Sequence, residues 1–319
     1  RIFRDGFDWE EQEPHNPWAN IGYWGDHQII YLLKLLELSK EFNPDSLERL
    51  LDNELFTFAN VPYRIKDYQD ILKDPRNTIE FDYKLDEQLK TDEKLYGSDT
   101  KLLKKKDYSL VQVSLMEKLL LTLLVKMSNF IPGGGIWMNT QRPEWNDAKN
   151  ALVGYGISMV TLFYIRRYVN FLKSLLSDTS INKFNLSIEI VQFFSTIHNT
   201  ILELTKKSEG EISDRERKKI VDKLGVAGSD YRKKIYKNGF NGEKQEISAR
   251  MIIEFCELSL SVIDRTIDEN KRKDGLYHSY NILHISENEL KVTHLYEMLE
   301  GQVAVLSSGY LSGLESTEL

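Results

Sequence analysis

The segment that indicates the fold class most clearly spans residues 26–42 and reads DHQIIYLLKLLELSKEF. Its apolar residues recur three and four positions apart, which is the spacing of one face of an α-helix. Asp26 stands where an N-terminal cap is expected, and Asn43-Pro44 ends the pattern because the residue before a proline disfavours the helical conformation. We therefore predict a helix over residues 26–42.

Similar apolar spacing recurs along the chain, and the strict alternation of a half-buried strand is nearly absent. Ser109 and Ser213 precede two of these patterns as cap residues. Further helices are predicted at about 110–129, 151–176, 182–207, 213–223, 228–237, 245–270 and 292–312. Long helices joined by residue-rich loops favour helix pairs arranged in a ring. We predict an all-α protein with one domain, residues 1–319, and an irregular insertion or long loop at about 53–108.

The composition excludes several classes of protein. The chain has 319 residues, and its net charge of -7 argues against a nucleic-acid-binding surface, which needs clustered positive charge. The longest uncharged run, Ala151 to Ile165, is shorter than a membrane span, so no membrane association is expected. Cys256 is the only cysteine, so a disulfide is excluded, and no Cys/His cluster for zinc is present. Because the chain opens on Arg1, an export signal could be missing, and the localisation stays open.

All five tryptophans fall in two segments that are predicted to be loops. They are Trp9, Trp18 and Trp24 in the first segment, and Trp137 and Trp145 in the second. A helical core needs no such segregation, so the pattern favours exposed aromatic faces that line a site. Sugars suit such faces, because their C–H surfaces stack on indole rings while their hydroxyls bind carboxylates and amides. The alternative is that these side chains fill the core at the ends of the helices.

The first of these segments leads directly into the predicted helix at 26–42. Trp24, Asp26, His27 and Gln28 stand together at this junction, and we predict that they bind substrate. Asp26 could equally cap the helix, because a carboxylate at that position accepts hydrogen bonds from the first helical amides. Both roles are compatible.

The second segment combines a glycine run, Gly133 to Gly135, with a dense group of polar residues. The spacing matches neither a dinucleotide-binding nor a P-loop motif, so the glycines indicate flexible or closely approached backbone. Arg142, Glu144, Trp145, Asn146 and Asp147 follow. A tryptophan beside a carboxyl group can raise its pKa, as a general acid requires. The alternative is that Asp147 caps the next helix.

A third polar cluster lies near the C-terminus and contains His278, Tyr280, Glu300 and Gln302. Gly301 interrupts an apolar helical pattern at a cost of about 1 kcal/mol, which indicates a packing or site requirement. Glu300 is the candidate base. The histidines His278, His284 and His294 do not share metal-ligand spacing on one helix, so no metal is predicted.

Two of these motifs resemble those of cellobiose and chitobiose phosphorylases and their relatives among the six-hairpin glycosidases. The motifs are Gly22-Tyr23-Trp24-Gly25-Asp26-His27-Gln28 and Glu144-Trp145-Asn146-Asp147-Ala148. The resemblance implies an (α/α)6 barrel in which Asp147 is the general acid, Trp145 lines the sugar site and Asp26 holds sugar hydroxyls. The chain departs from the phosphorylases at Pro143-Glu144, where they place Gly or Ala and then Asp. Their phosphate-binding elements have only approximate counterparts in His278 and Ser308-Gly309.

These observations lead to the hypothesis of an inverting enzyme that cleaves an oligosaccharide or polysaccharide without a cofactor. Asp147 would protonate the leaving oxygen, and Glu300, or else Glu144, would activate water from about 6.5 to 9.5 Å away. A hydrolase is favoured over a phosphorylase. Inorganic phosphate would need a cradle, for which Arg142, His278 and residues 307–309 are the candidates. Two competing hypotheses are a non-catalytic carbohydrate-binding protein and an all-α protein that docks a peptide.

Overall fold

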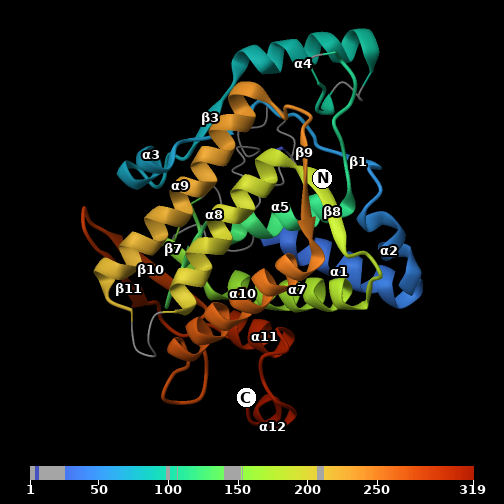
Figure 1. Cartoon of the computed structure of the whole chain (residues 1–319). Coiled ribbons are helices and arrows are strands. Elements are labelled where there is room, and N and C mark those ends of the chain that lie inside the picture. The colour runs from blue at the N-terminus through green and yellow to red at the C-terminus, as the bar shows by residue number, and fades with distance from the viewer. Residues whose placement is uncertain are drawn as a thin grey trace.

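The computed structural model describes residues 4–6, 26–97, 101–105, 107–139, 152, 154–206 and 212–319, with the backbone alone for 26–28. The prediction of an all-α (α/α)6 barrel is wrong. The fold is mixed, with 57% of residues in helices and 17% in strands, and it contains a curled five-stranded antiparallel sheet. Helices nevertheless dominate the outline of the molecule (Figure 1).

The described helices are α1 Asp26–Phe42, α2 Pro44–Leu51, α3 Tyr68–Lys73, α4 Tyr83–Tyr96, α5 Leu115–Met127, α7 Met159–Asp178, α8 Ile188–Thr205, α9 Asp214–Asn238, α10 Ala249–Glu269, α11 Leu299–Ser307 and α12 Gly313–Glu318. The described strands are β1 Phe56–Thr57, β2 Tyr63–Ile65, β3 Ile79–Phe81, β4 Gln112–Val113, β5 Phe130–Ile131, β6 Gly135–Trp137, β7 Gly156–Ser158, β8 Lys183–Ser187, β9 Lys244–Ser248, β10 Tyr280–Ile285 and β11 Leu290–His294. The region from 53 to 108 is thus built of short strands and the helices α3 and α4.

The five-stranded sheet has the order β11-β10-β7-β6-β5, and each neighbouring pair is antiparallel. One row of paired residues crosses four of its strands, because Trp137 pairs with Ile157, Ile157 with Asn281, and Asn281 with His294. Directly paired residues project to the same face of a sheet. The row therefore brings a polar pair, Asn281 and His294, next to two buried apolar side chains.

Three of the strands were missed because each is short and continues without a break into a helix. Strands β7, β8 and β9 end at Ser158, Ser187 and Ser248, and each serine is also the N-cap of the following helix. The hydroxyls of Ser158 and Ser248 accept hydrogen bonds from helix amides, whereas that of Ser187 donates to buried Glu117 at 2.7 Å. The predicted helices at 151–176, 182–207 and 245–270 are therefore wrong in their first residues.

Helix α9 is continuous where the sequence predicted two helices. Its internal glycines do not interrupt the helix; they are needed because neighbouring residues approach the helix closely. A Cβ atom at Gly225 would lie 2.2 Å from the ring of Tyr68, and one at Gly228 would lie 2.9 Å from Ser128 Oγ. Helices α3 and α5 therefore approach this helix so closely that larger side chains do not fit.

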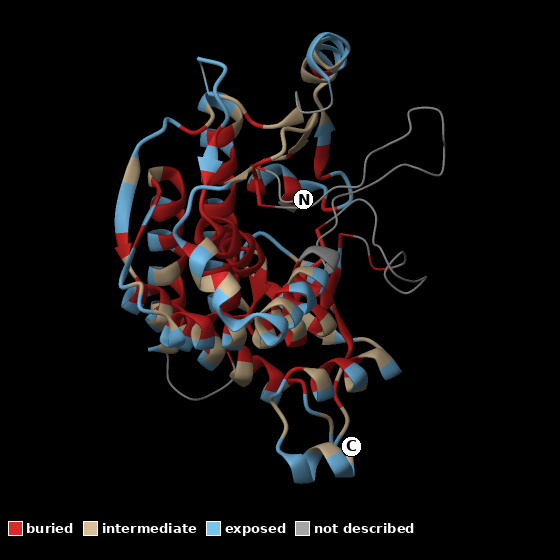
Figure 2. Ribbon diagram, turned by 90° about the vertical axis from the view of Figure 1, so that its right-hand side faces the viewer, coloured by how far each residue is buried: buried red, intermediate tan, exposed pale blue. Residues whose placement is uncertain are grey.

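The core is centred on α5, all 13 of whose residues are buried. Buried residues fill the middle of the molecule and exposed ones lie on the outer turns of the surrounding helices (Figure 2). Helix α7 packs against α1, α10 and α11. The short helices α4 and α12 lie at opposite ends of the molecule (Figure 1).

Candidate functional site

Helices α1 and α7 run parallel, so they begin at the same end of the molecule. Glu37 of α1 binds Arg167 of α7 at 2.7 Å, and Lys40 binds Asp178 at 2.7 Å. The residue numbers rise together in the two helices, which fixes their common direction. The start of α1 at Asp26 therefore lies at the same end as Ser158, the N-cap of α7.

Helix α11 runs in this direction as well. Near its start, the amide of Gly301 donates to Ser279 Oγ at 2.8 Å, and the carbonyl oxygen of Ser279 accepts from the amide of Met159 at 3.0 Å. Near its end, Arg167 donates to Ser307 Oγ at 2.8 Å. Helices α1, α7 and α11 thus begin together, and we call this part of the molecule the site end.

The described ends of the segment that contains Glu144 and Asp147 also lie at the site end. The amide of Met138 donates to the carbonyl of Gly156 at 2.9 Å, and the amide of Gly154 donates to the carbonyl of Met138 at 3.1 Å. The indole Nε1 of Trp137 donates to the carbonyl of Gly154 at 2.8 Å. Met138 and Gly154, which flank this segment, therefore lie side by side directly before α7.

Met138, Leu152 and Tyr280 form a small apolar cluster that is separate from the main core, with Met298 packed against it. Met298 is the N-cap of α11 and lies two residues before Glu300. The cluster joins both ends of the 140–151 segment to the start of α11. The sequence predicted site residues both in the 140–151 segment and at the start of α11. The cluster shows that the residues flanking the first segment pack against the same side chains as the start of α11.

Four predicted site residues have described positions close to this cluster. Glu300 lies in the first turn of α11. Gln302 holds the backbone before β10, because its Oε1 accepts from the amide of Tyr277 at 2.9 Å and its Nε2 donates to the carbonyl of Tyr277 at 2.7 Å. Tyr280 and Trp137 are only 2% and 3% exposed, so both rings belong to the packing of the site end.

His278 stacks on His294, with ring centroids 3.8 Å apart and an angle of 2° between the ring planes. Desolvation lowers the pKa of His278 to about 4, with a further contribution from His294 and Arg272. Desolvation also lowers the pKa of His294. Two parallel rings in contact favour the neutral form of both imidazoles, because a charge on either would be poorly solvated.

Asn281 determines which nitrogen of His294 carries the proton. Its side-chain amide donates to the carbonyl of Gly134 at 2.7 Å and to Asn270 Oδ1 at 2.8 Å, so its oxygen remains to accept from His294 Nδ1 at 2.8 Å. In the neutral ring Nδ1 is then the donor, and Nε2 keeps its lone pair. These hydrogen bonds of Asn281 were not predicted from the sequence, because the strand pairing that brings Asn281 next to His294 leaves no local pattern.

Charged residues stand beside the histidine pair. Arg272 binds Asp274 at 2.6 Å and Glu297 at 2.7 Å. Hydrogen bonds from Arg272 lower the pKa of Asp274, and hydrogen bonds from the backbone and Arg272 lower the pKa of Glu297. Both carboxylates are therefore negative at neutral pH.

The glycine run at 133–135 is closely approached backbone, one of the two possibilities read from the sequence. A Cβ atom at Gly133 would lie 2.6 Å from Glu269 Oε2, and one at Gly135 would lie 2.7 Å from the carbonyl oxygen of Ser158. Both glycines have positive φ values, of +73° and +121°. Neither position accommodates another residue without displacement or strain.

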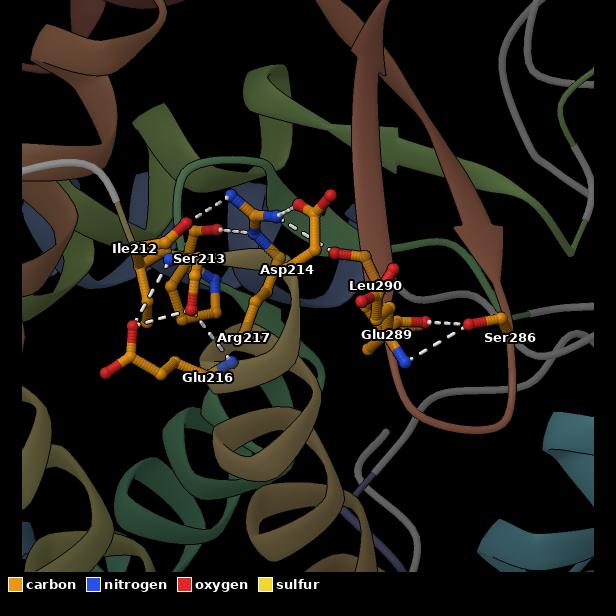
Figure 3. A network of polar contacts seen from close by, with 9 residues as sticks. Ile212, Ser213, Asp214, Glu216, Arg217, Ser286, Glu289 and Leu290 are labelled. Atoms are coloured by element: carbon orange, nitrogen blue, oxygen red, sulfur yellow. Dashed lines mark hydrogen bonds and ion pairs between the residues drawn. The ribbon is translucent and has the colours of Figure 1, made fainter.

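Arg217 of α9 binds the residue directly before this glycine run, and Figure 3 shows its contacts with Ile212, Asp214 and Leu290. Its guanidinium donates to the carbonyls of Pro132 at 2.8 Å, Leu290 at 2.9 Å and Ile212 at 3.2 Å, and it pairs with Asp214. One buried side chain thereby joins α9, the turn after β5 and the strand β11. These contacts connect α9 to the sheet that supports the site end.

The remaining predicted site residues lie outside what the structure describes. The first turn of α1 contains the backbone of Asp26, His27 and Gln28, but their side chains are not described. The others, for which neither backbone nor side chain is described, are Trp24, Arg142, Glu144, Trp145, Asn146 and Asp147.

The suggested phosphate cradle at 307–309 lies at the C-terminal end of α11. Ser307 and Ser308 lie at the far end of α11, about 12 Å along the helix from its start. Arg167 binds the carbonyl and hydroxyl of Ser307, and Arg166 binds the carbonyl of Ser308. These groups brace α11 against α7.

Among the described residues, no group of three or more His, Cys, Asp or Glu side chains is arranged to hold a metal ion. No helix in the described ranges has the length and apolar character needed to cross a bilayer. Comparison of the chain with protein-family models and with curated proteins found no match.

Proposed function

We propose that the protein cleaves a glycosidic bond of an oligosaccharide or polysaccharide with inversion, as a hydrolase. Asp147 donates a proton to the leaving oxygen, and Glu300 is the first candidate for the base that activates water, with Glu144 as the second. The observation that supports this proposal is the common start of α1, α7 and α11, beside the anchored ends of the 140–151 segment.

The site end offers groups suited to a sugar. Asp26, Trp24 and Trp145 are proposed to bind the sugar ring, and His278 is proposed to bind a hydroxyl through a neutral imidazole. Gln302 contributes indirectly, because it holds the backbone that carries His278.

Hydrolysis is preferred to phosphorolysis because of the position of Ser307 and Ser308. Their polar groups are engaged by arginines of α7 at the far end of α11, away from Glu300. A phosphate bound there would lie about 12 Å along α11 from the site end. Water needs no such cradle, only a carboxylate base on the opposite face of the sugar.

The test is a screen of oligosaccharides, followed by kinetics of Asp147→Asn and Glu300→Gln. We expect each variant to lose about 10²- to 10⁴-fold in kcat, which is the usual contribution of a general acid or base. Asp178→Asn, at the opposite end of α7, is the control and should stay within about twofold of wild type, because its exposed ion pair touches no substrate.

Each outcome points to one function. Sugar release that requires added phosphate would replace the hydrolase with a phosphorylase. Binding to a carbohydrate array without cleavage would indicate a non-catalytic protein. Full activity of Asp147→Asn would overturn the assignment of the acid.

A further inference from the structure

A cleft of about 520 Å³ lies between helices α8 and α9, and none of its lining residues belongs to the site end. The two helices lie side by side (Figure 1). They run antiparallel, because Lys223 of α9 binds Glu203 near the end of α8 at 2.5 Å, whereas Lys234 donates to Gln192 Oε1 near its start at 3.0 Å. The volume is within the range of about 300 to 1,000 Å³ that is typical of sites for small organic molecules.

One charged residue of this cleft is buried. Among its described lining residues, Glu189 is only 8% exposed, whereas the other charged side chains are exposed. Its Oε1 accepts from the amide of Asn241 at 2.9 Å, but its Oε2 is buried and has no hydrogen-bond partner among the residues that the structure describes. Glu189 lies in the first turn of α8, which stabilises its negative charge. A buried carboxylate oxygen without a donor costs free energy, and a ligand that brings a donor removes that cost.

Two further charges in the cleft, Lys234 and Asp230, form no ion pair with a described residue. Lys234 donates only to the neutral side-chain amide of Gln192, and Asp230 is exposed. Gln192 lies three residues, or about 4.5 Å, beyond Glu189 along α8, and Asp230 lies four residues, or about 6 Å, from Lys234 along α9. Because the helices are antiparallel, the three charges follow one another along the cleft in the order negative, positive, negative.

The wall between the second and third of these charges is apolar. Phe193 and Tyr231 line the cleft, and each is 3% exposed. Their rings stack with centroids 4.9 Å apart and an angle of 10° between the planes. Phe193 follows Gln192 in the sequence and Tyr231 follows Asp230, so the stack lies between the levels of Lys234 and Asp230. A short chain of methylene groups that joins an anion to a cation would pack against it.

We propose that the cleft binds a free basic amino acid, with lysine and arginine as the candidates. The α-ammonium group donates to Glu189, the carboxylate binds Lys234, and the side-chain cation binds Asp230 while the methylene groups lie on the aromatic stack. The ligand thus carries positive, negative and positive charge in the order that complements the cleft. The four methylene groups of lysine are long enough for the step of about 6 Å between Lys234 and Asp230.

Other small ions match the cleft less well. A phosphate-like anion would need convergent cations, but Lys223 and Lys234 are eleven residues, or about 16 Å, apart on α9, and Lys223 already binds Glu203. A plain diamine would leave Lys234 between its two cations without an anion. The proposal is independent of sugar cleavage, because it concerns other residues and is tested without a sugar.

The first experiment is titration calorimetry of the full wild-type chain with lysine and arginine, and then with ligands that each lack one group of lysine. Norleucine lacks the side-chain ammonium, Nα-acetyl-lysine lacks the α-ammonium, and cadaverine lacks the carboxylate. We expect each of the three to bind about tenfold or more weakly than lysine, since each loses one hydrogen bond between charged groups. No binding of lysine or arginine at about 10 mM, or norleucine that binds as tightly as lysine, would overturn the proposal.

The second experiment assigns each ligand group to its residue. Asp230→Asn should bind lysine and norleucine with similar affinity, because the partner of the missing ammonium is gone. In the same way, Glu189→Gln should no longer distinguish lysine from Nα-acetyl-lysine, and Lys234→Gln should no longer distinguish lysine from cadaverine. Glu254→Gln, at an exposed position of α10 outside the cleft, is the control and should bind every ligand as wild type does. Thermal melts check that the variants are folded, and folded variants that weaken all four ligands equally would contradict the assignment.

Discussion

Helix α9 buries an arginine near each of its ends, and the two are in opposite situations. Arg217 is 9% exposed and donates to three main-chain carbonyls while it pairs with Asp214. Arg232 is 6% exposed, yet it makes no hydrogen bond or ion pair with any residue that the structure describes, and its Nε is buried. The same side chain is thus an anchor at one end of the helix, whereas at the other end its Nε has no hydrogen-bond partner among the described residues.

The difference shows where the molecule requires fixed geometry. Burial of a charged group costs free energy unless its donors and acceptors form hydrogen bonds. When one partner of such a network is removed, the remaining buried groups lose their hydrogen bonds, and the folded state is destabilised. The Arg217 end supports the sheet, the glycine loop and hence the site end. The Arg232 end lies about 22 Å further along the helix, where no residue proposed for the site end is found among those that the structure describes.

The largest expected effect is that of Arg217→Met. The substitution leaves three carbonyls and Asp214 without their donor, and we expect a loss of about 3 to 5 kcal/mol in the free energy of unfolding. Urea unfolding measures it. Arg215→Met is the control, because Arg215 is exposed and pairs only with Glu289 among the described residues, so its loss should be below about 0.5 kcal/mol. Equal effects of the two substitutions would contradict the anchoring role.

Asn281→Leu should have the next largest effect. Asn281 is fully buried, and its replacement removes the partner of the Gly134 carbonyl, of Asn270 Oδ1 and of His294 Nδ1, which we expect to cost about 2 to 3 kcal/mol. The comparison is Asn185→Leu on an exposed position of β8, where about 0.5 kcal/mol or less is expected. If Asn281→Leu left the free energy of unfolding unchanged, the stability of the sheet would not depend on the hydrogen bonds of Asn281.

The histidine pair predicts a dependence of stability on pH. The pKa of His278 is about 4 in the folded chain, so between pH 6.5 and 4 the unfolded chain binds more protons. Stability should therefore fall as the pH is lowered through this range, by about 1 kcal/mol because the ring is partly exposed and screened. His278→Gln should flatten the slope of Tm against pH, whereas His284→Gln, at an exposed position, should leave it unchanged. If His278→Gln left the slope of Tm against pH unaltered, His278 would not be the cause of the pH dependence.

Arg232→Met should have the smallest effect and sharpen the comparison. Since the guanidinium has no described polar partner, its replacement by an apolar chain of similar length should change the free energy of unfolding by less than about 1 kcal/mol, in either direction. Differential scanning calorimetry beside Arg217→Met would show the contrast. A loss as large as that of Arg217→Met would mean that Arg232 is satisfied after all.

Local signals predicted several boundaries correctly. Helix α1 spans residues 26–42 and ends before Asn43-Pro44 as expected, and Ser213 caps α9 in a reciprocal arrangement with Glu216. The cap assigned to Ser109 was wrong, because α5 begins after Ser114 instead. Cap and proline effects act within a few residues, so the sequence specifies them wherever no tertiary contact intervenes.

Of the candidate site, the sequence indicated the cluster of His278, Tyr280, Glu300 and Gln302, and the structure places these residues around the start of α11. The roles of Asp26 and Asp147 remain predictions. His294 and Asn281 were not predicted as a pair, because β10 and β11 had to be recognised as strands before their register could be known.

The sequence alone determined both ends of α1 and the start of α9, and it indicated how polar residues cluster, since these depend on neighbours within one or two turns. Only the tertiary structure decided that serine-ended strands assemble into a sheet and that α1, α7 and α11 share a direction. It also decided that Arg217 donates to three carbonyls, whereas the buried Nε of Arg232 has no hydrogen-bond partner among the described residues. Such features arise from contacts between residues distant in the chain, whose free energy no local pattern records.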